Sequence, residues 1–257
     1  MKITFYKYQG TGNDFIIIDN RQGFAHFTTH QINFLCNRKF GIGADGLMLL
    51  NLLNGYDFEM VYYNADGKES TMCGNGGRCL TQFAKDIGII KEKYVFMATD
   101  GVHEALFEQN GWVALKMKDV STIATFNNDK IVNTGSPHYV QQVENVSAKN
   151  VFADGREIRY SHAFAAEGIN VNFVQPTPNG ITVRTYERGV EDETLSCGTG
   201  VTACALVFSN ENLHQRISIE TLGGQLAVEF DKENDQHFTN IYLCGPATFV
   251  FKGEIDV

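Results

Sequence analysis

The stretch Cys73-Gly-Asn-Gly-Gly-Arg-Cys79 has a shorter match later in the chain, Cys197-Gly-Thr-Gly200. Each puts a cysteine directly before the glycine-rich start of a long apolar segment. A thiol at a helix start faces backbone N–H groups that have no intrahelical partner and the positive end of the helix dipole, and both favour a thiolate and a bound anion. Two such sites predict two thiols that flank one substrate carbon, one removing a proton and the other returning it to the opposite face.

The segments around these cysteines predict a mixed α/β protein. We expect helices at residues 75–87, with Gly88 as the stop, and at 199–210, where apolar residues on nearly every side indicate a buried helix. Strand-like runs are Phe15–Asp19, Phe58–Tyr63, Trp112–Met117, Val171–Val174, Ile181–Tyr186, Ile217–Thr221 and Thr248–Phe251. Asn-Gly and Asp-Gly pairs predict turns at residues 66–67, 100–101, 154–155 and 179–180.

The chain aligns with itself at three ordered points. Thr11-Gly12-Asn13 falls on Thr134-Gly135-Ser136, and Tyr63-Asn64 falls on Tyr186-Glu187, while Cys73 falls one residue short of Cys197. This predicts two pseudo-symmetric α/β (α+β) halves, each a mixed β-sheet or barrel wrapped around one helix. We expect halves at residues 1–120 and 121–257, with the C-terminal tail returning to the first half, and a cleft in which the two helix N-termini face each other.

The composition limits the class of protein. At 257 residues, 43% hydrophobic and 20% charged, the chain has the make-up of a globular protein with a full core. A net charge of −9 argues against nucleic acid or an anionic membrane as the main partner. There is no signal-peptide pattern or membrane span, and six cysteines are too sparse for a disulfide scaffold, so we expect a reduced, cytoplasmic protein.

Other chemistries for the cysteines fit the sequence less well. The spacing of Cys73 from Cys79 differs from the short pairs of zinc sites, and no histidine cluster accompanies it, so we expect no metal. A redox dithiol pair stays open as an alternative. Glycines at residues 10–12 and 41–43 lack the third glycine of a nucleotide fingerprint. Pyridoxal phosphate is not excluded by motif, but a two-thiol site does not need it. The cysteines expected to be inert and buried are Cys36, Cys79, Cys204 and Cys244.

Two helix N-termini suit an amino acid whose carboxylate they hold, with its α-carbon between the sulfurs. The natural backbone donors are those of Gly74, Asn75, Gly198 and Thr199. Without an electron sink the α-proton is a very weak acid, so we expect desolvation of the closed site. Further candidates, each with an ordinary structural reading as a turn former, surface pair or loop residue, are Asn13, Asn64, Asn170, Glu187, Arg188 and His138.

Six ordered motifs across essentially the whole chain resemble the diaminopimelate epimerase family. They are Lys7-x-x-Gly-x-Gly-Asn-Asp-Phe15, Tyr63-Asn-Ala-Asp-Gly67, Cys73-Gly-Asn-Gly-Gly-Arg-Cys79, Gly135-Ser-Pro-His138, Tyr186-Glu-Arg-Gly189 and Cys197-Gly-Thr-Gly200. The resemblance implies epimerisation of LL- to meso-diaminopimelate without cofactor, on the route to lysine and peptidoglycan, by a homodimer.

By position, the resemblance makes Cys73 and Cys197 the acid/base pair. It puts the carboxylate of the reacting end at Gly74, Asn75, Gly198 and Thr199. Asn13, Asn64, Asn170, Glu187 and Arg188 would line the pocket, with Arg188 on the distal carboxylate, and His138 and Glu187 would modulate the thiols. Three residues depart from the family pattern: Ser136 for an asparagine, Gly46 for a glutamine, and Phe251 for a tyrosine at the dimer interface.

A proline or hydroxyproline racemase is the nearest alternative, because that family is similar in fold to the one expected here and also uses two cysteines. Asn75 and the pair Glu187-Arg188 favour diaminopimelate over that family. Phenazine-type isomerases of similar fold lack the paired cysteines. A thiol-based metal or redox module is the non-enzymatic alternative, and it gives no role to Arg188.

Overall fold

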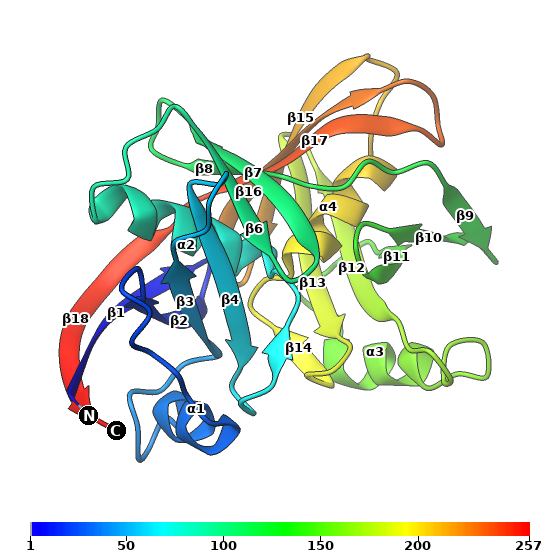
Figure 1. Ribbon diagram of the computed structural model, residues 1–257. Coiled ribbons are helices and arrows are strands. Elements are labelled where there is room, and N and C mark those ends of the chain that lie inside the picture. Colours follow the sequence, from blue (N-terminus) through cyan, green and yellow to red (C-terminus); the bar gives the residue numbers. More distant parts are fainter. Residues whose placement is uncertain (1) are drawn as a thin grey trace. The chain divides into compact units, whose positions relative to one another are not determined.

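The computed structural model describes residues 2–257. The chain forms two compact units (Figure 1). The first contains the chain up to Leu115 together with Gly245–Val257, and the second contains Lys116–Cys244. Each unit has its own sheet and its own central helix, so we describe them one at a time.

The first unit is a sheet with the strand order β18-β1-β2-β3-β4-β6-β7-β8. The β2/β3 and β4/β6 pairs are parallel, and the other neighbours are antiparallel. Its elements are β1 (Lys2–Gly10), β2 (Asn13–Asp19), α1 (Thr29–Cys36), β3 (Gly46–Asn51), β4 (Phe58–Asn64), β5 (Glu69–Ser70), α2 (Gly74–Asp86), β6 (Lys93–Ala98), β7 (Gly101–Phe107), β8 (Val113–Lys116) and β18 (Thr248–Asp256).

The second unit has the strand order β9-β10-β11-β12-β13-β15-β16-β17, with β11/β12 and β13/β15 parallel. Its elements are β9 (Ile123–Phe126), β10 (Asp129–Asn133), β11 (Pro137–Gln142), α3 (Val151–Arg159), β12 (Asn170–Thr177), β13 (Gly180–Glu187), β14 (Asp192–Thr194), α4 (Gly198–Val207), β15 (His214–Thr221), β16 (Gly224–Lys232) and β17 (Phe238–Gly245).

The two units repeat one connectivity. In each, an antiparallel hairpin leads through a short helix to a parallel neighbour, and a second hairpin then leads through the central helix to another parallel neighbour. Strand β18 lies beside β1 as β9 lies beside β10, so the C-terminal strand completes the first sheet. The fold class predicted from the internal repeat is therefore confirmed: a mixed α/β protein of two similar, sheet-dominated halves.

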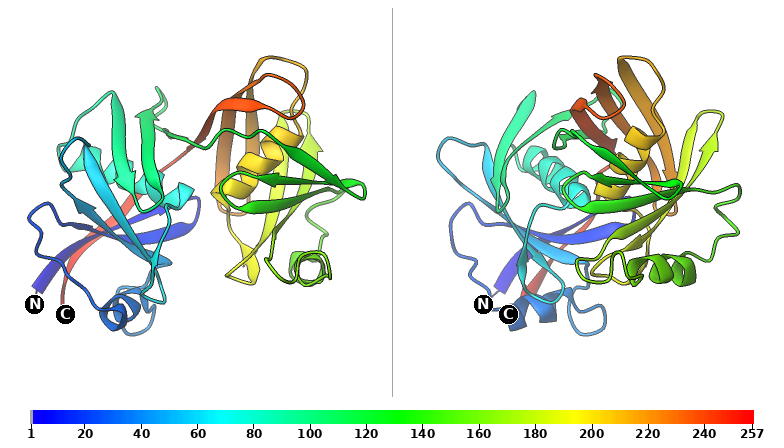
Figure 2. Two further views of the ribbon diagram at one scale, coloured as in Figure 1. Left: turned by 45° about the vertical axis from the view of Figure 1, so that its right-hand side comes forward. Right: turned by 90° about the vertical axis from the view of Figure 1, so that its right-hand side faces the viewer.

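The central helices form where the sequence predicts them. Helix α2 begins after the extended residue Cys73 and ends before Gly88, whose φ of 93° is accessible to glycine. Helix α4 has eight buried residues among its ten, which confirms the prediction of a buried helix. Figure 2 shows α4, in yellow, running among the strands of its unit. The first turns of both helices are buried, at Gly74–Gly77 in α2 and at Gly198, Gly200 and Val201 in α4.

One predicted turn is wrong. The Asp154-Gly155 pair lies inside α3, not between strands. A Cβ atom on Gly155 would lie 2.4 Å from the Cβ of Tyr186, so glycine is what lets α3 pack against β13. The other three pairs lie at strand connections, as predicted. Helices α1 and α3 were not predicted from the sequence.

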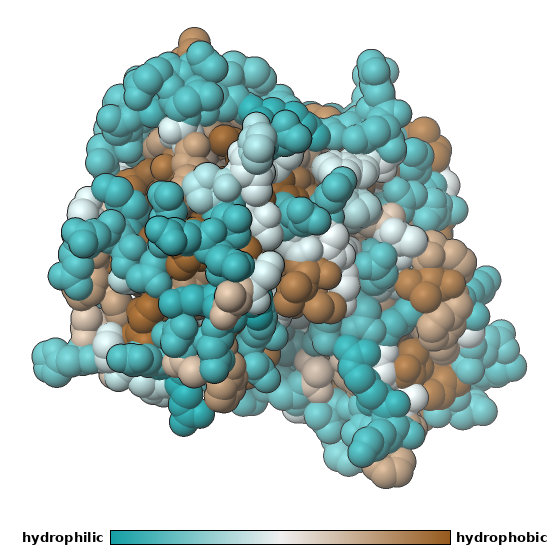
Figure 3. Space-filling view, turned by 180° about the vertical axis from the view of Figure 1, so that it is seen from behind, coloured by the Kyte–Doolittle hydropathy of each residue, from teal (hydrophilic) through white to brown (hydrophobic). Residues whose placement is uncertain are grey.

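The face drawn in Figure 3 is mainly hydrophilic, with separate brown apolar groups. Within the described part of the chain, no helix is long and apolar enough to span a membrane. Strand β18 carries three consecutive apolar residues, Phe249, Val250 and Phe251, that are 47%, 51% and 44% exposed. Such a run is typical of a contact surface.

Candidate active site

The first unit holds Cys73 at the start of α2. Its sulfur lies 3.6 Å from Oδ1 of Asn13, and the amide of Asn75 donates to the same oxygen at 3.4 Å. Asn13 in turn donates from Nδ2 to Asp45 at 2.6 Å. Because a carboxylate only accepts hydrogen bonds, Asp45 fixes the amide of Asn13 with its oxygen toward the thiol. Gly74 and Asn75 supply the first N–H groups of the helix, which lack intrahelical partners in any α-helix.

A charged network holds Asp45 and the strand that carries Asn13. Arg38 bonds both Asp14, at 2.7 Å, and Asp45, at 2.8 Å, and Lys7 pairs with Asp14 at 2.7 Å. Burial raises the pKa of Asp14, but the bonds and charges of Arg38 and Lys7 outweigh it and hold this pKa well below its usual range. Asp14 therefore stays ionised at neutral pH, and Arg38 ties it to Asp45, the residue that anchors Asn13.

Arg78 brings a buried positive charge to the start of α2. The side chain is 0% exposed and donates to Oδ1 of Asn75 at 3.1 Å and to Oγ1 of Thr11 at 3.4 Å. A Cβ atom on Gly10 would lie 3.3 Å from the guanidinium, so glycine leaves room for it. A guanidinium in a low-dielectric environment strengthens the preference of this helix start for an anion.

The remaining cysteines are buried thiols. Burial raises the pKa of Cys36 and of Cys79 to about 12 and that of Cys204 well above its usual value. These three stay protonated at neutral pH and are poor nucleophiles. Cys244 is also buried, which confirms the sequence interpretation of all four as packed residues. Among residues 2–257 no group of three or more His, Cys, Asp or Glu side chains could hold a metal ion.

The second unit holds Cys197 at the start of α4, only 8% exposed. Its sulfur lies 3.5 Å from the hydroxyl of Thr199, and this hydroxyl lies 2.9 Å from Nε2 of His138. On the other side of the ring, Nδ1 of His138 lies 3.2 Å from Nδ2 of Asn172. The carbonyl of Thr199 accepts from Thr134 at 2.8 Å. The histidine thus reaches the thiol through the Thr199 hydroxyl.

Burial lowers the pKa of His138 to about 3, and the charge of Arg188 adds to the shift. The ring is therefore neutral at physiological pH. It acts on the thiol by hydrogen bonding and not as a nearby cation.

This shift makes stability depend on pH. His138 of the unfolded chain, with an ordinary pKa near 6.5, takes up a proton below that pH, whereas the folded ring does so only near pH 3. The contribution of neutral His138 to the free energy of unfolding is therefore fully present above pH 6.5 and is lost as the pH falls toward 3. Between pH 7 and pH 4, the melting temperature of His138→Gln should fall less than that of the wild type. The exposed control His162→Gln should parallel the wild type, and parallel curves for all three would contradict the assignment.

A second cluster in this unit gathers Asn170, Arg188 and Ser136. Asn170 donates to the Ser136 hydroxyl at 2.8 Å and accepts from the backbone N–H of Arg188 at 2.9 Å. The guanidinium of Arg188 donates to Ser136 at 3.4 Å and to the carbonyl of Glu167 at 2.9 Å. The cluster orients Arg188, whose side chain is exposed and can meet an anion. The neighbouring Glu187 accepts from Thr194 at 2.9 Å.

Asn64 is the remaining predicted site residue of the first unit. It lies exposed at the end of β4, paired in register with Gly46 of β3. A Cβ atom on Gly46 would lie 2.5 Å from the ring of Tyr62. The Tyr62 ring therefore occupies the space that a side chain at position 46 would need, which explains the glycine there.

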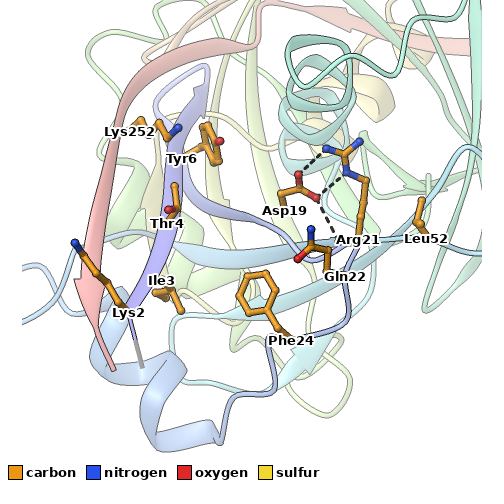
Figure 4. Close-up of a pocket in the computed structure, with 10 residues that line it drawn as sticks. All are labelled: Lys2, Ile3, Thr4, Tyr6, Asp19, Arg21, Gln22, Phe24, Leu52 and Lys252. Atoms are coloured by element: carbon orange, nitrogen blue, oxygen red, sulfur yellow. Dashed lines mark hydrogen bonds and ion pairs between the residues drawn. The ribbon is translucent and has the colours of Figure 1, made fainter.

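One groove of the first unit lies apart from these residues (Figure 4). It has a volume of about 610 Å³ and is formed by β1, β2 and β18 with the residues that follow β2. Asp19 and Arg21, which both line it, form an ion pair at 2.7 Å, as the figure shows. None of the predicted site residues lines it.

Sequence reasoning missed Asn172, Asp45 and Arg78. Asn172 left a signal, because it is a polar residue in the middle of the apolar run Val171–Val174, and a buried asparagine needs partners. Arg78 left a similar signal, because it is a charged residue between the glycines and the apolar residues Cys79 and Leu80 of its helix. Asp45 lies in a loop before β3, and its approach to Asn13 follows only from the pairing of β2 with β3.

The fold defines a class of proteins with solved structures, two of which have low sequence identity to this chain. A phenazine biosynthesis protein of the PhzF family from Bacillus anthracis has a TM-score of 0.76 at 14% identity and covers 100% of both chains. A hydroxyproline epimerase from Agrobacterium vitis has a TM-score of 0.63 at 13% identity, covering 99% of this chain and 91% of its own.

The family follows from sequence likeness. A family model described as diaminopimelate epimerase matches residues 5–123 and 130–250. A diaminopimelate epimerase from Flavobacterium psychrophilum is 53% identical over 254 residues, 97% of this chain and 99% of its own. One from Chlorobaculum tepidum is 43% identical over 258 residues, 96% of this chain and 98% of its own. The chain belongs to the diaminopimelate epimerase family, and it is an isomerase.

Proposed function

We propose that this chain epimerises LL-diaminopimelate to meso-diaminopimelate in the cytoplasm, for lysine and peptidoglycan precursor synthesis. One observation carries the proposal beyond family membership. In both units a cysteine is the residue directly before a buried central helix. A pair of such thiols can invert one carbon, because each can reach it from its own side.

The proposed reaction needs the two thiols and the substrate alone. The thiolate of one cysteine removes the α-proton as the C–H bond breaks. The electron pair passes to the carbanion, which the adjacent carboxylate delocalises, and the S–H group of the other cysteine returns a proton to the opposite face. The N–H groups of Gly74, Asn75, Gly198 and Thr199 hold that carboxylate and stabilise the charge that develops on it.

The distal end of the substrate is assigned to the second cluster. Arg188 binds the distal carboxylate in a charge-assisted pair, and Asn170 orients Arg188 through its backbone. Asn13 and Asn64 add hydrogen bonds from the first unit, and Glu187 and His138 modulate the thiols. Ser136 supports the proposal, because its hydroxyl bonds both Asn170 and Arg188.

The test is proton exchange in deuterated water with the reduced protein. LL-diaminopimelate should lose its α-proton NMR signal as the meso isomer appears, while L-proline and L-glutamate keep theirs. Exchange of L-proline in place of diaminopimelate would move the chain to the proline racemase type of activity. No exchange of any of the three would contradict the two-thiol reaction.

We also propose that the chain is a homodimer joined through β18. The exposed run at Phe249, Val250 and Phe251 supports this. Sedimentation equilibrium should give twice the chain mass, and Phe251→Asp should lower it. A monomer at all concentrations would contradict the proposal.

A further inference from the structure

A buried asparagine, Asn172, contacts the histidine that lies beside the Thr199 hydroxyl. We propose that Asn172 is a positioning residue for proton transfer at Cys197. It holds His138 in the tautomer with the proton on Nε2, so that the Thr199 hydroxyl donates its hydrogen to the Cys197 sulfur. This inference rests on the proposed function and deepens it, because it assigns the group that stabilises one of the two thiolates.

The first step is the orientation of the Asn172 amide. Its Nδ2 lies 2.9 Å from the carbonyl oxygen of Tyr139, and a carbonyl only accepts. Its Oδ1 accepts from the hydroxyl of Thr185 at 2.9 Å. Both contacts require the same orientation, so the second hydrogen on Nδ2 faces Nδ1 of His138, at 3.2 Å.

The second step is the tautomer. Because Nδ1 of His138 accepts a hydrogen bond, the single proton of the neutral ring sits on Nε2. That N–H donates to Oγ1 of Thr199 at 2.9 Å. The hydroxyl hydrogen of Thr199 is then available to the Cys197 sulfur at 3.5 Å. A hydrogen bond donated to a thiolate favours the ionised form.

The packing around these groups supports a fixed relay. Asn172 and His138 are each 0% exposed, so bulk water does not compete for their hydrogen bonds. A Cβ atom on Gly200 would lie 2.5 Å from Oδ1 of Asn172, which explains the glycine that ends the Cys-Gly-Thr-Gly stretch. The charged and titratable groups that interact with the relay are Arg188, which adds to the lowering of the His138 pKa, and Cys204, whose pKa Cys197 helps to raise.

The experiment reads the tautomer and the thiol separately, without substrate. Nitrogen-15 NMR of the histidine-labelled protein should show His138 as a neutral ring with the proton on Nε2. Iodoacetamide alkylation against pH, resolved by peptide mass spectrometry, gives a midpoint for each reactive cysteine. Asn172→Leu should raise the midpoint of Cys197 by about one pH unit and leave that of Cys73 unchanged. It should lower kcat by about tenfold, with little change in KM.

Two further variants complete the design. Thr202→Val removes another buried hydroxyl of α4, one that donates to the Gly198 carbonyl at 2.9 Å, and should leave both midpoints in place. Thr199→Val should reproduce the shift at Cys197, and adding Asn172→Leu to it should have no further effect. If Asn172→Leu does not fold, the inference is tested by the tautomer of His138 in the wild type and by the alkylation midpoint of Cys197 in Thr199→Val.

Three results would overturn the inference: a proton on Nδ1 in the wild type, an unmoved Cys197 midpoint in both relay variants, or equal shifts of both cysteines. The outcome is independent of the reaction itself. If the tautomer and the shift appear but diaminopimelate does not exchange, the relay stands and the proposed function fails.

Discussion

Replacing Cys73 or Cys197 with alanine is expected to lower net epimerisation by roughly 10³-fold or more, because inversion needs an acid on one face and a base on the other. The informative readout is exchange without inversion. In the proposed reaction each thiol acts from one side of the α-carbon, so the thiol that remains can remove and return a proton there. The two variants should therefore exchange the α-proton of opposite isomers in deuterated water, one acting on LL-diaminopimelate and the other on the D centre of the meso isomer.

The matched control is Cys204→Ala. This cysteine lies within α4, the helix that begins directly after Cys197. It is fully buried, and its raised pKa keeps it protonated. Its removal should leave exchange and inversion of both isomers near the wild-type rates. Exchange of the same isomer by both alanine variants would show that the two thiols do not act from opposite faces.

The sequence predicted the elements that local pattern determines. The two central helices and the seven strand-like runs follow from apolar patterning, with Gly88 as one helix stop, and the structure confirms them. The fold class followed from the internal repeat, because Thr11-Gly12 and Thr134-Gly135 both lie in the turns of the repeated hairpins β1/β2 and β10/β11. The Asp154-Gly155 turn failed because packing against Tyr186 outweighed the local preference of that pair.

The site was predictable only where a motif carried it. The two helix-start cysteines and the residues next to them in the chain could be named, since their chemistry depends on local geometry. The supporting residues could not, because their partners are far away in sequence. Asn172 reaches His138 across the β11/β12 pair, and Asp45 reaches Asn13 beside the β2/β3 pair. Such contacts follow from strand register, which one sequence does not fix.

Arg188→Met is expected to lower kcat/KM for diaminopimelate by about 10²-fold, mainly through KM, because it removes a charge-assisted pair with the distal carboxylate. L-Lysine differs from diaminopimelate by the loss of that carboxylate, so it provides the matched substrate. The wild type should exchange the α-proton of diaminopimelate far faster than that of L-lysine, and Arg188→Met should reduce this preference by the same factor. Arg156→Met removes another exposed arginine of the same unit and should change neither rate. If Arg188→Met slowed both substrates equally, Arg188 would act by holding Ser136 and the Glu167 carbonyl and not by binding substrate.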